Sequence, residues 1–169
     1  DYLMKLAHQE GVQDLTLTFQ LPEIDRDATK KRVEAALEKY RFYLLTVPEE
    51  RLPKVTATYS LVPPAHSNAF HSSTETAVID KVDFEQERDE YMKWIRRGVN
   101  RLSQRERELI IKRYLSDEEM YDYELYNEMG MSESKYYRLK ARTFYKLAFI
   151  LRIEVYKEGA VQNELPPVK

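Results

Sequence analysis

A group of polar and basic side chains between Ser132 and Arg142 has the types and spacing needed to bind a nucleic-acid duplex. The segment 131–157 around it carries seven Lys or Arg against two Glu, whereas 115–129 carries six Asp or Glu and no Lys or Arg. Arginine and small polar side chains can bind base edges, and neighbouring cations can bind phosphates. We expect base contacts from Glu133, Ser134, Tyr137 and Arg138, and phosphate contacts from Ser132, Lys135, Lys140 and Arg142.

These side chains need a helix with exposed first turns, and the local sequence predicts one. A short helix over 122–129 is followed by Gly130, which reaches the positive φ of a helix end without a steric clash. Ser132 stands where an N-cap belongs, directly before a second helix that starts at Glu133. Two helices joined by a short turn that contains glycine are typical of a helix-turn-helix unit. An αα-hairpin with a solvated basic face fits the same pattern and is the alternative.

The second helix has an apolar side that predicts how it packs. Tyr136, Leu139, Thr143 and Leu147 recur at spacings of three and four, which places them on one inward-facing stripe. The stripe continues past the motif, so we expect the helix to run on through Val155 until Gly159. This extension could pack on the N-terminal part of the chain, which we favour, or on a second subunit in a homodimer. Its residues are Phe144, Leu147, Ala148, Leu151 and Val155.

The C-terminal half resembles the promoter-recognition domain of bacterial sigma factors. The similarity runs from 102–115 (LSQRERELIIKRYL) through Gly130-Met131-Ser132 to Lys146-Leu147. The segment 134–140 (SKYYRLK), followed by Phe144-x-x-Leu147-Ala148, is similar to the ArpU family of phage late-gene transcriptional regulators, which is related to the RinA type. Tyr137 stands where sigma factors usually carry a basic residue, so their promoter element is not expected to be the target.

The ArpU resemblance covers roughly 21–156 and includes Leu21-Pro22-Glu23-Ile24-Asp25 and Glu38-x-Tyr40-Arg41. It implies a sequence-specific double-stranded DNA-binding transcriptional regulator that activates phage late genes for packaging and lysis. Two alternatives stay open. One is a sigma-like factor that associates with RNA polymerase, and the other is a protein-interaction component of phage packaging or antirepression.

Composition narrows the other possibilities. The chain has 169 residues, a net charge of −2 and no cysteine, so affinity for DNA must come from local basic surfaces and thiolate chemistry is excluded. No apolar run is long enough for a membrane span. We find no catalytic arrangement and no cofactor or metal motif, and we expect His66 and His71 to be loop histidines. The expectation is a non-enzymatic protein of the bacterial host cytoplasm.

The order of patterns along the chain predicts a mainly α fold with two parts. We expect a small N-terminal α or α+β module at 1–61, a linker at 62–79, a sigma-like four-helix domain with the helix-turn-helix at 80–158, and a tail at 159–169. The module would contain strands at 15–19 and 54–60 around a helix that starts at Asp25 or Asp27 and ends near Leu44. The domain would open with a helix over 80–101, and a second helix ending near Leu115 would start at the capping box Ser103/Glu106.

Overall fold

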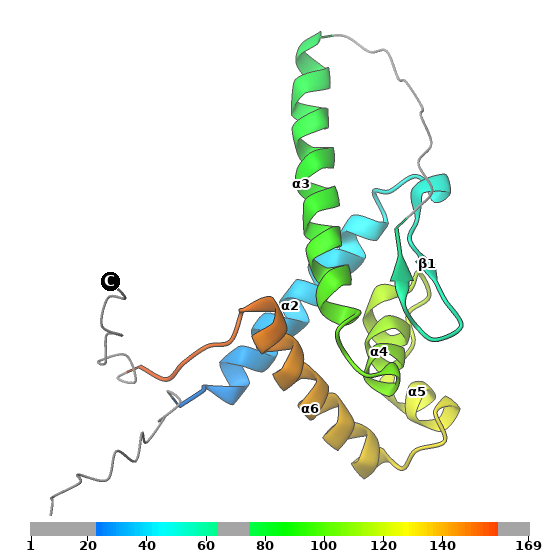
Figure 1. Ribbon diagram of the computed structural model, residues 1–169, viewed down its shortest axis with the longest axis vertical. Coiled ribbons are helices and arrows are strands. Elements are labelled where there is room, and N and C mark those ends of the chain that lie inside the picture. The colour runs from blue at the N-terminus through cyan, green and yellow to red at the C-terminus, as the bar shows by residue number, and fades with distance from the viewer. Residues whose placement is uncertain (1–22, 64–74, 159–169) are drawn as a thin grey trace, which may run out of the picture. The chain divides into compact units, whose positions relative to one another are not determined.

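The predicted mainly α fold is confirmed. The computed structural model describes residues 23–63 and 75–158, and for 75–80 it describes the backbone alone. The strand expected at 15–19, His66, His71 and the tail at 159–169 lie outside these residues. The elements, seen in Figure 1, are α2 (Arg26–Leu44), the 3₁₀ turn η1 (Glu49–Arg51), β1 (Lys54–Val55), β2 (Leu61–Val62), α3 (Glu75–Val99), α4 (Gln104–Ile110), the π-helical turn η2 (Ile111–Leu115), α5 (Asp122–Glu128) and α6 (Glu133–Leu151).

Helix α2 forms where its pattern predicts. Asp25 is the N-cap, and its carboxylate accepts a hydrogen bond from the backbone N–H of Ala28 at 2.9 Å. Val33, Leu37 and Tyr40 have no exposed surface, so the apolar stripe of this helix lies wholly inside the core.

The expected division between a module at 1–61 and a domain at 80–158 differs from the structure. The described residues between 24 and 155 form one unit with a shared hydrophobic core, in which α2 packs against α3, η2 and α6. The hydroxyl of Tyr91 on α3 donates to the carbonyl of Ala36 on α2 at 2.8 Å. The physical reason is that the apolar stripe of α2 is buried by packing against α3 and α6. In a second unit, Lys157 pairs with Glu23 at 2.8 Å.

The expected strand at 54–60 is a hairpin with two very short strands. β1 and β2 are antiparallel, with Val55 opposite Leu61, and 56–60 form the connecting loop. The side-chain amide of Asn100 fixes this hairpin to the end of α3, because it accepts from the N–H of Leu61 at 2.9 Å and donates to its carbonyl at 3.0 Å. The guanidinium of Arg107 donates to the carbonyl of Tyr59 at 2.9 Å. The hairpin is therefore part of the helical unit.

Helices α3 and α6 approach each other closely at Gly98. A Cβ added there would lie 2.5 Å from Cδ2 of Leu151, so any larger residue would force the Leu151 side chain to shift. The predicted capping box after α3 is confirmed, because the N–H of Ser103 donates to Glu106 Oε2 at 2.9 Å. The helix that it starts reaches Leu115 as expected, with its last turn in π-helical form.

The predicted continuation of α6 to Gly159 is wrong, because the helix ends at Leu151. Arg152 takes up a left-handed conformation (φ 57°, ψ 46°), and the N–H of Ile153 donates to the carbonyl of Ala148 at 2.9 Å. This is the 6→1 bond of a Schellman-type ending. Val155 is then held beside α2, where its carbonyl accepts from the N–H of Asp25 at 2.8 Å. This pairing with α2 draws the chain away from the helix axis.

The apolar face of α6 packs within the same chain, as we favoured. Phe144, Leu147, Ala148 and Leu151 are all buried in the core that α2 shares. In the described part of the chain, no helix is both long and apolar enough to cross a membrane.

Candidate functional site

Helices α5 and α6 form a helix-turn-helix unit. Gly130 lies in the turn with φ 64°, and the N–H of the next residue, Met131, donates to the carbonyl of Tyr126 at 2.8 Å. Ser132 is the N-cap of α6, and its hydroxyl accepts from the N–H of Lys135 at 3.4 Å. The sequence therefore predicted both helices and the residues that join them. Figure 1 shows α5 lying against the start of α6.

The inner face of α6 holds the unit together. Tyr136 and Thr143 have no exposed surface and Leu139 is 8% exposed, which confirms the predicted apolar stripe. The Tyr136 ring packs against Tyr126 of α5, with ring centroids 5.8 Å apart. The position of α6 relative to α5 is thus fixed by side chains that point away from solvent.

Asp122, the first residue of α5, is the polar centre of this contact. Its Oδ1 accepts from the hydroxyl of Tyr136 at 2.7 Å and from Nε of Arg113 at 3.1 Å. Lys140 donates to both carboxylate oxygens, at 3.0 and 2.9 Å. One carboxylate thereby joins η2, α5 and α6.

This arrangement changes the role expected for Lys140. The sequence placed it on an exposed flank as a phosphate contact, but the structure leaves it only 8% exposed and paired with Asp122. Helical spacing alone could not reveal a partner 18 residues away. Lys140 therefore serves the packing of the helix-turn-helix unit, and the candidate surface does not include its charge.

Charge and burial act in opposite directions on Asp122. Burial raises the pKa of its carboxyl, but the hydrogen bonds from Tyr136 and Lys140 and the charges of Lys140 and Arg113 hold the pKa below its ordinary value. The pKa of the Tyr136 phenol is raised by burial and by its bond to the carboxylate. Both groups therefore keep at neutral pH the protonation states that their hydrogen bond needs.

The other candidate residues lie on the solvent side of α6. The four expected base contacts, Glu133, Ser134, Tyr137 and Arg138, are all exposed on its first two turns. Nε of Arg138 donates to the carbonyl of Ser134 at 3.3 Å, which leaves the other guanidinium donors available.

Of the remaining expected phosphate contacts, Lys135 and Arg142 are exposed and form no ion pair with any described residue. Ser132 is exposed too, although its hydroxyl oxygen is engaged as the helix cap. Lys146, farther along α6, donates to the buried carboxylate of Glu106 at 2.7 Å. The available positive charge of α6 is therefore carried by Lys135, Arg138 and Arg142.

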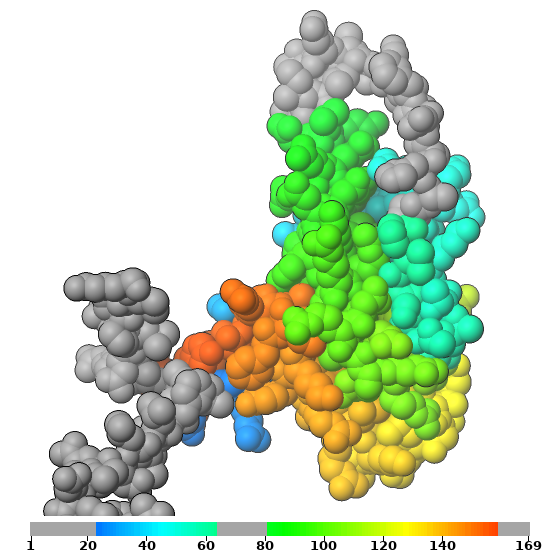
Figure 2. Space-filling view, in the orientation of Figure 1, coloured from blue at the N-terminus to red at the C-terminus, as the bar shows by residue number. Residues whose placement is uncertain are grey.

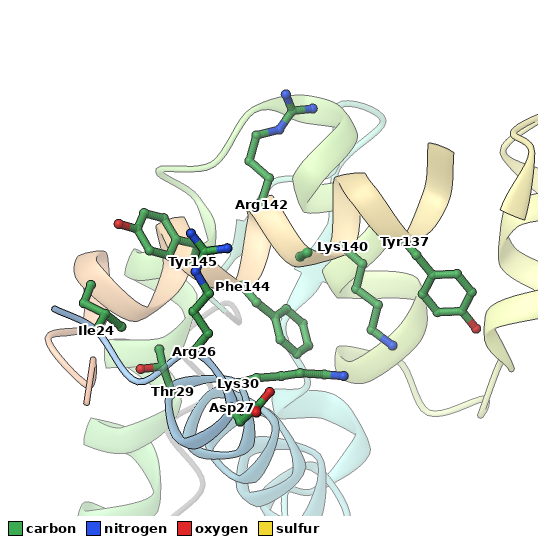
Figure 3. A pocket seen from close by; sticks show the side chains of 11 residues that line it. Ile24, Arg26, Asp27, Thr29, Lys30, Tyr137, Lys140, Arg142, Phe144 and Tyr145 are labelled. Atoms are coloured by element: carbon green, nitrogen blue, oxygen red, sulfur yellow. The ribbon is translucent and has the colours of Figure 1, made fainter. Parts of the chain in front are cut away.

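The structure adds two cations that the sequence did not suggest for this site. Arg26 and Lys30, from the first turns of α2, line a cavity of about 570 Å³ together with Tyr137, Arg142 and Tyr145 of α6 (Figure 3). In the space-filling view the start of α2, in blue, emerges beside the orange surface of α6 (Figure 2). Arg26 and Lys30 were not predicted for this site because the sequence placed their helix in a separate N-terminal module. The basic start of α2, RDATKKR at 26–32, is the sequence feature that could have indicated them.

Fold and site together define a mainly helical protein built around a helix-turn-helix unit with an exposed, cationic second helix. The chain is 39% identical to a phage-related protein of Listeria innocua over 139 residues, which are 82% of this chain and 97% of the relative. It therefore belongs to the family of that phage-related protein. It is also 28% identical to Protein Gp66 of Listeria phage A118 over 140 residues, 81% of this chain and 96% of the relative. No family model and no solved structure matches the chain.

Proposed function

We propose that the protein is a sequence-specific double-stranded DNA-binding transcriptional regulator of the ArpU type that activates phage late genes for packaging and lysis. The observation that carries the proposal is the exposed start of α6, where Glu133, Ser134, Tyr137 and Arg138 face solvent while Tyr136 and Leu139 fix the helix from behind. A recognition helix requires this separation between an outer reading face and an inner packing face.

The chemistry of the exposed face fits the major groove of DNA. Arg138 can bind O6 and N7 of guanine in bidentate fashion, and Glu133 can accept from the N4 amino group of cytosine. Ser134 and Tyr137 can act as donors or acceptors. Lys135 and Arg142, on the flanks, can bind phosphates and so add affinity and salt dependence rather than sequence discrimination.

The late-gene role has a separate basis. It rests on the ArpU-like segments 134–140 and 144–148 and agrees with the kinship to phage-related proteins. The direction of regulation, activation, rests on the same resemblance. The site of action would be the cytoplasm of the bacterial host.

The experiment is selection of bound duplexes from a randomised double-stranded DNA pool at near-physiological salt. We expect a sharp enriched motif, and its symmetry would show whether a monomer or a dimer binds, since two-fold sites reflect protein symmetry. Salt-sensitive retention without a motif would contradict sequence-specific reading. No retention would contradict DNA binding altogether.

A polymerase-associated role is the second candidate, and one surface favours it. Tyr121 and Tyr123, at the start of α5, are each 55% exposed and stack with ring centroids 6.0 Å apart. Aromatic residues are enriched at protein interfaces relative to the rest of the surface. If this surface binds RNA polymerase, a pulldown without DNA should recover the core enzyme, and the Tyr121→Ser/Tyr123→Ser variant should lose it. Recovery by neither protein would contradict the role, and equal recovery by both would contradict the assignment of this surface.

A further inference from the structure

The cavity between α2 and α6 has charged and aromatic walls. Arg26 and Lys30 come from α2, and Tyr137, Arg142 and Tyr145 come from α6 (Figure 3). All five side chains are exposed, so the cavity opens to solvent beside the outer face of α6. We refer to it as the α2–α6 groove.

Positive charge in the α2–α6 groove is not neutralised. Arg26, Lys30 and Arg142 form no ion pair with any residue that the structure describes, and the groove contains one acidic residue, Asp27. The fourth cation in its lining, Lys140, is already paired with Asp122. Figure 3 shows the guanidinium of Arg142 directed away from α2, so the available cations on the α2 side of the groove are Arg26 and Lys30. Two available cations against one carboxylate still give the groove a net positive charge suited to an anionic ligand.

Other cations of the unit form ion pairs that join its elements. Lys112 bridges Glu108 and Glu128 at 3.2 and 2.7 Å, and Lys146 is paired with Glu106 at 2.7 Å. These side chains stabilise contacts between elements. The available cations of the α2–α6 groove form no such ion pair with a described residue. The fold nevertheless brings them together from segments that are distant in the sequence.

We propose that the α2–α6 groove binds the sugar–phosphate backbone of the DNA strand that flanks α6, with Arg26 and Lys30 as phosphate contacts from outside the helix-turn-helix unit. The inference rests on the proposed function. An α-helix with its side chains is about 10–12 Å wide and fills a major groove of about 12 Å, so the two backbones must run along its flanks. Tyr137 is both a candidate base contact and a wall of the α2–α6 groove, which places one flank there.

Within this arrangement, the phosphates are bound from the α2 side of the groove. Arg26 and Lys30 approach the strand from α2, while the ring of Tyr145 on α6 offers an apolar surface to the sugars. Such contacts fix the orientation of the protein on the duplex without reading bases. The first turns of α2 thus act as a second DNA-binding element, and the shared core keeps their distance from α6 fixed.

The test compares two double variants of α2 that remove the same charge. Arg26→Ala/Lys30→Ala removes the two cations of the groove, and Lys31→Ala/Arg32→Ala removes two exposed cations of the same helix that do not line it. The affinity of each protein for the selected duplex and for a random duplex is measured by fluorescence anisotropy between 50 and 200 mM salt. Thermal unfolding verifies that both variants keep the stability of the parent.

We expect Arg26→Ala/Lys30→Ala to weaken binding to both duplexes by the same factor and to reduce the salt slope by about two. Its deficit relative to the parent should therefore shrink roughly tenfold between 50 and 200 mM salt. The control variant should keep a slope close to that of the parent.

Three outcomes separate the two proposals. If the parent selects a motif and the two double variants bind alike, the groove is not a backbone site and the proposed function stands. If Arg26→Ala/Lys30→Ala loses affinity for the selected duplex alone, these side chains read sequence and the backbone assignment is overturned. If the parent binds no duplex, both the groove assignment and the proposed function fail.

Discussion

The ammonium group of Lys140 lies 2.9 Å from Oδ2 and 3.0 Å from Oδ1 of Asp122, so a charge pair on the inner side fastens α6 to the first residue of α5. The pair is mostly buried, and Arg113 and Tyr136 complete the bonding of the same carboxylate. The orientation of α6, and with it the face that α6 presents to solvent, depends on this contact.

Replacement of Lys140 by Met should therefore lower stability. The change keeps the aliphatic stem but removes the hydrogen-bonded ion pair with Asp122, and a hydrogen bond to a charged group contributes about 2 kcal/mol. We expect a loss of about that size in the free energy of unfolding, measured by urea denaturation. Lys135→Met is the matched control, because Lys135 is exposed, and its effect should stay within about 0.5 kcal/mol. Equal effects of the two changes would contradict a structural role for Lys140.

Low pH should destabilise the fold through protonation of the carboxylates of Asp122 and Glu106. The folded state lowers the pKa of Asp122 and of Glu106, so below pH 5 the unfolded chain binds more protons and stability rises with pH. The contribution is fully present above the unfolded pKa values of about 4 and is lost as the pH falls through the lower folded values. Urea denaturation between pH 2.5 and 6 should show this slope.

The variant Asp122→Asn isolates one part of that pH dependence. It should unfold more easily at pH 6 and show a shallower loss of stability towards low pH. Asp117→Asn, which alters an exposed carboxyl on the preceding loop, should follow the parent at every pH. A parent whose stability does not change over this range would contradict the account of Asp122 and Glu106.

The close crossing of α3 and α6 predicts that Gly98→Ala is destabilising. The added methyl group would lie 2.5 Å from Cδ2 of Leu151, and such overpacking typically costs about 1–3 kcal/mol. Leu151→Ala leaves room for the methyl group, so the double variant should lose less stability than the sum of the two single variants. Additive losses in a double-mutant cycle would show that the two residues do not meet.

Local signals explain how much of this architecture the sequence could predict. The stripe from Tyr136 to Leu147, the glycine turn at Gly130 and the box of Ser103 and Glu106 each act within a few residues of chain, and all three were found. The outer face of α6 followed from the same periodicity, because residues that cannot face the core must face solvent.

The predictions that were wrong depend on contacts between segments that are distant in the sequence. The end of α6 at Leu151 depends on the pairing of Val155 with Asp25, and the burial of Lys140 depends on Asp122. Neither partner is close enough in sequence to leave a periodic signal. The place of α2 in the common core, which brings Arg26 to α6, was missed for the same reason.

If the exposed start of α6 reads bases, the Arg138→Ala variant must bind DNA with lower affinity and lower specificity. Its affinity for the selected duplex should fall by about 1–3 kcal/mol, and discrimination at one base position should be lost. Lys135→Ala should weaken binding to selected and random duplexes equally, and Lys93→Ala, which alters an exposed residue of α3, should bind as the parent does. If Arg138→Ala and Lys135→Ala both bind selected and random duplexes as the parent does, α6 is not the recognition helix.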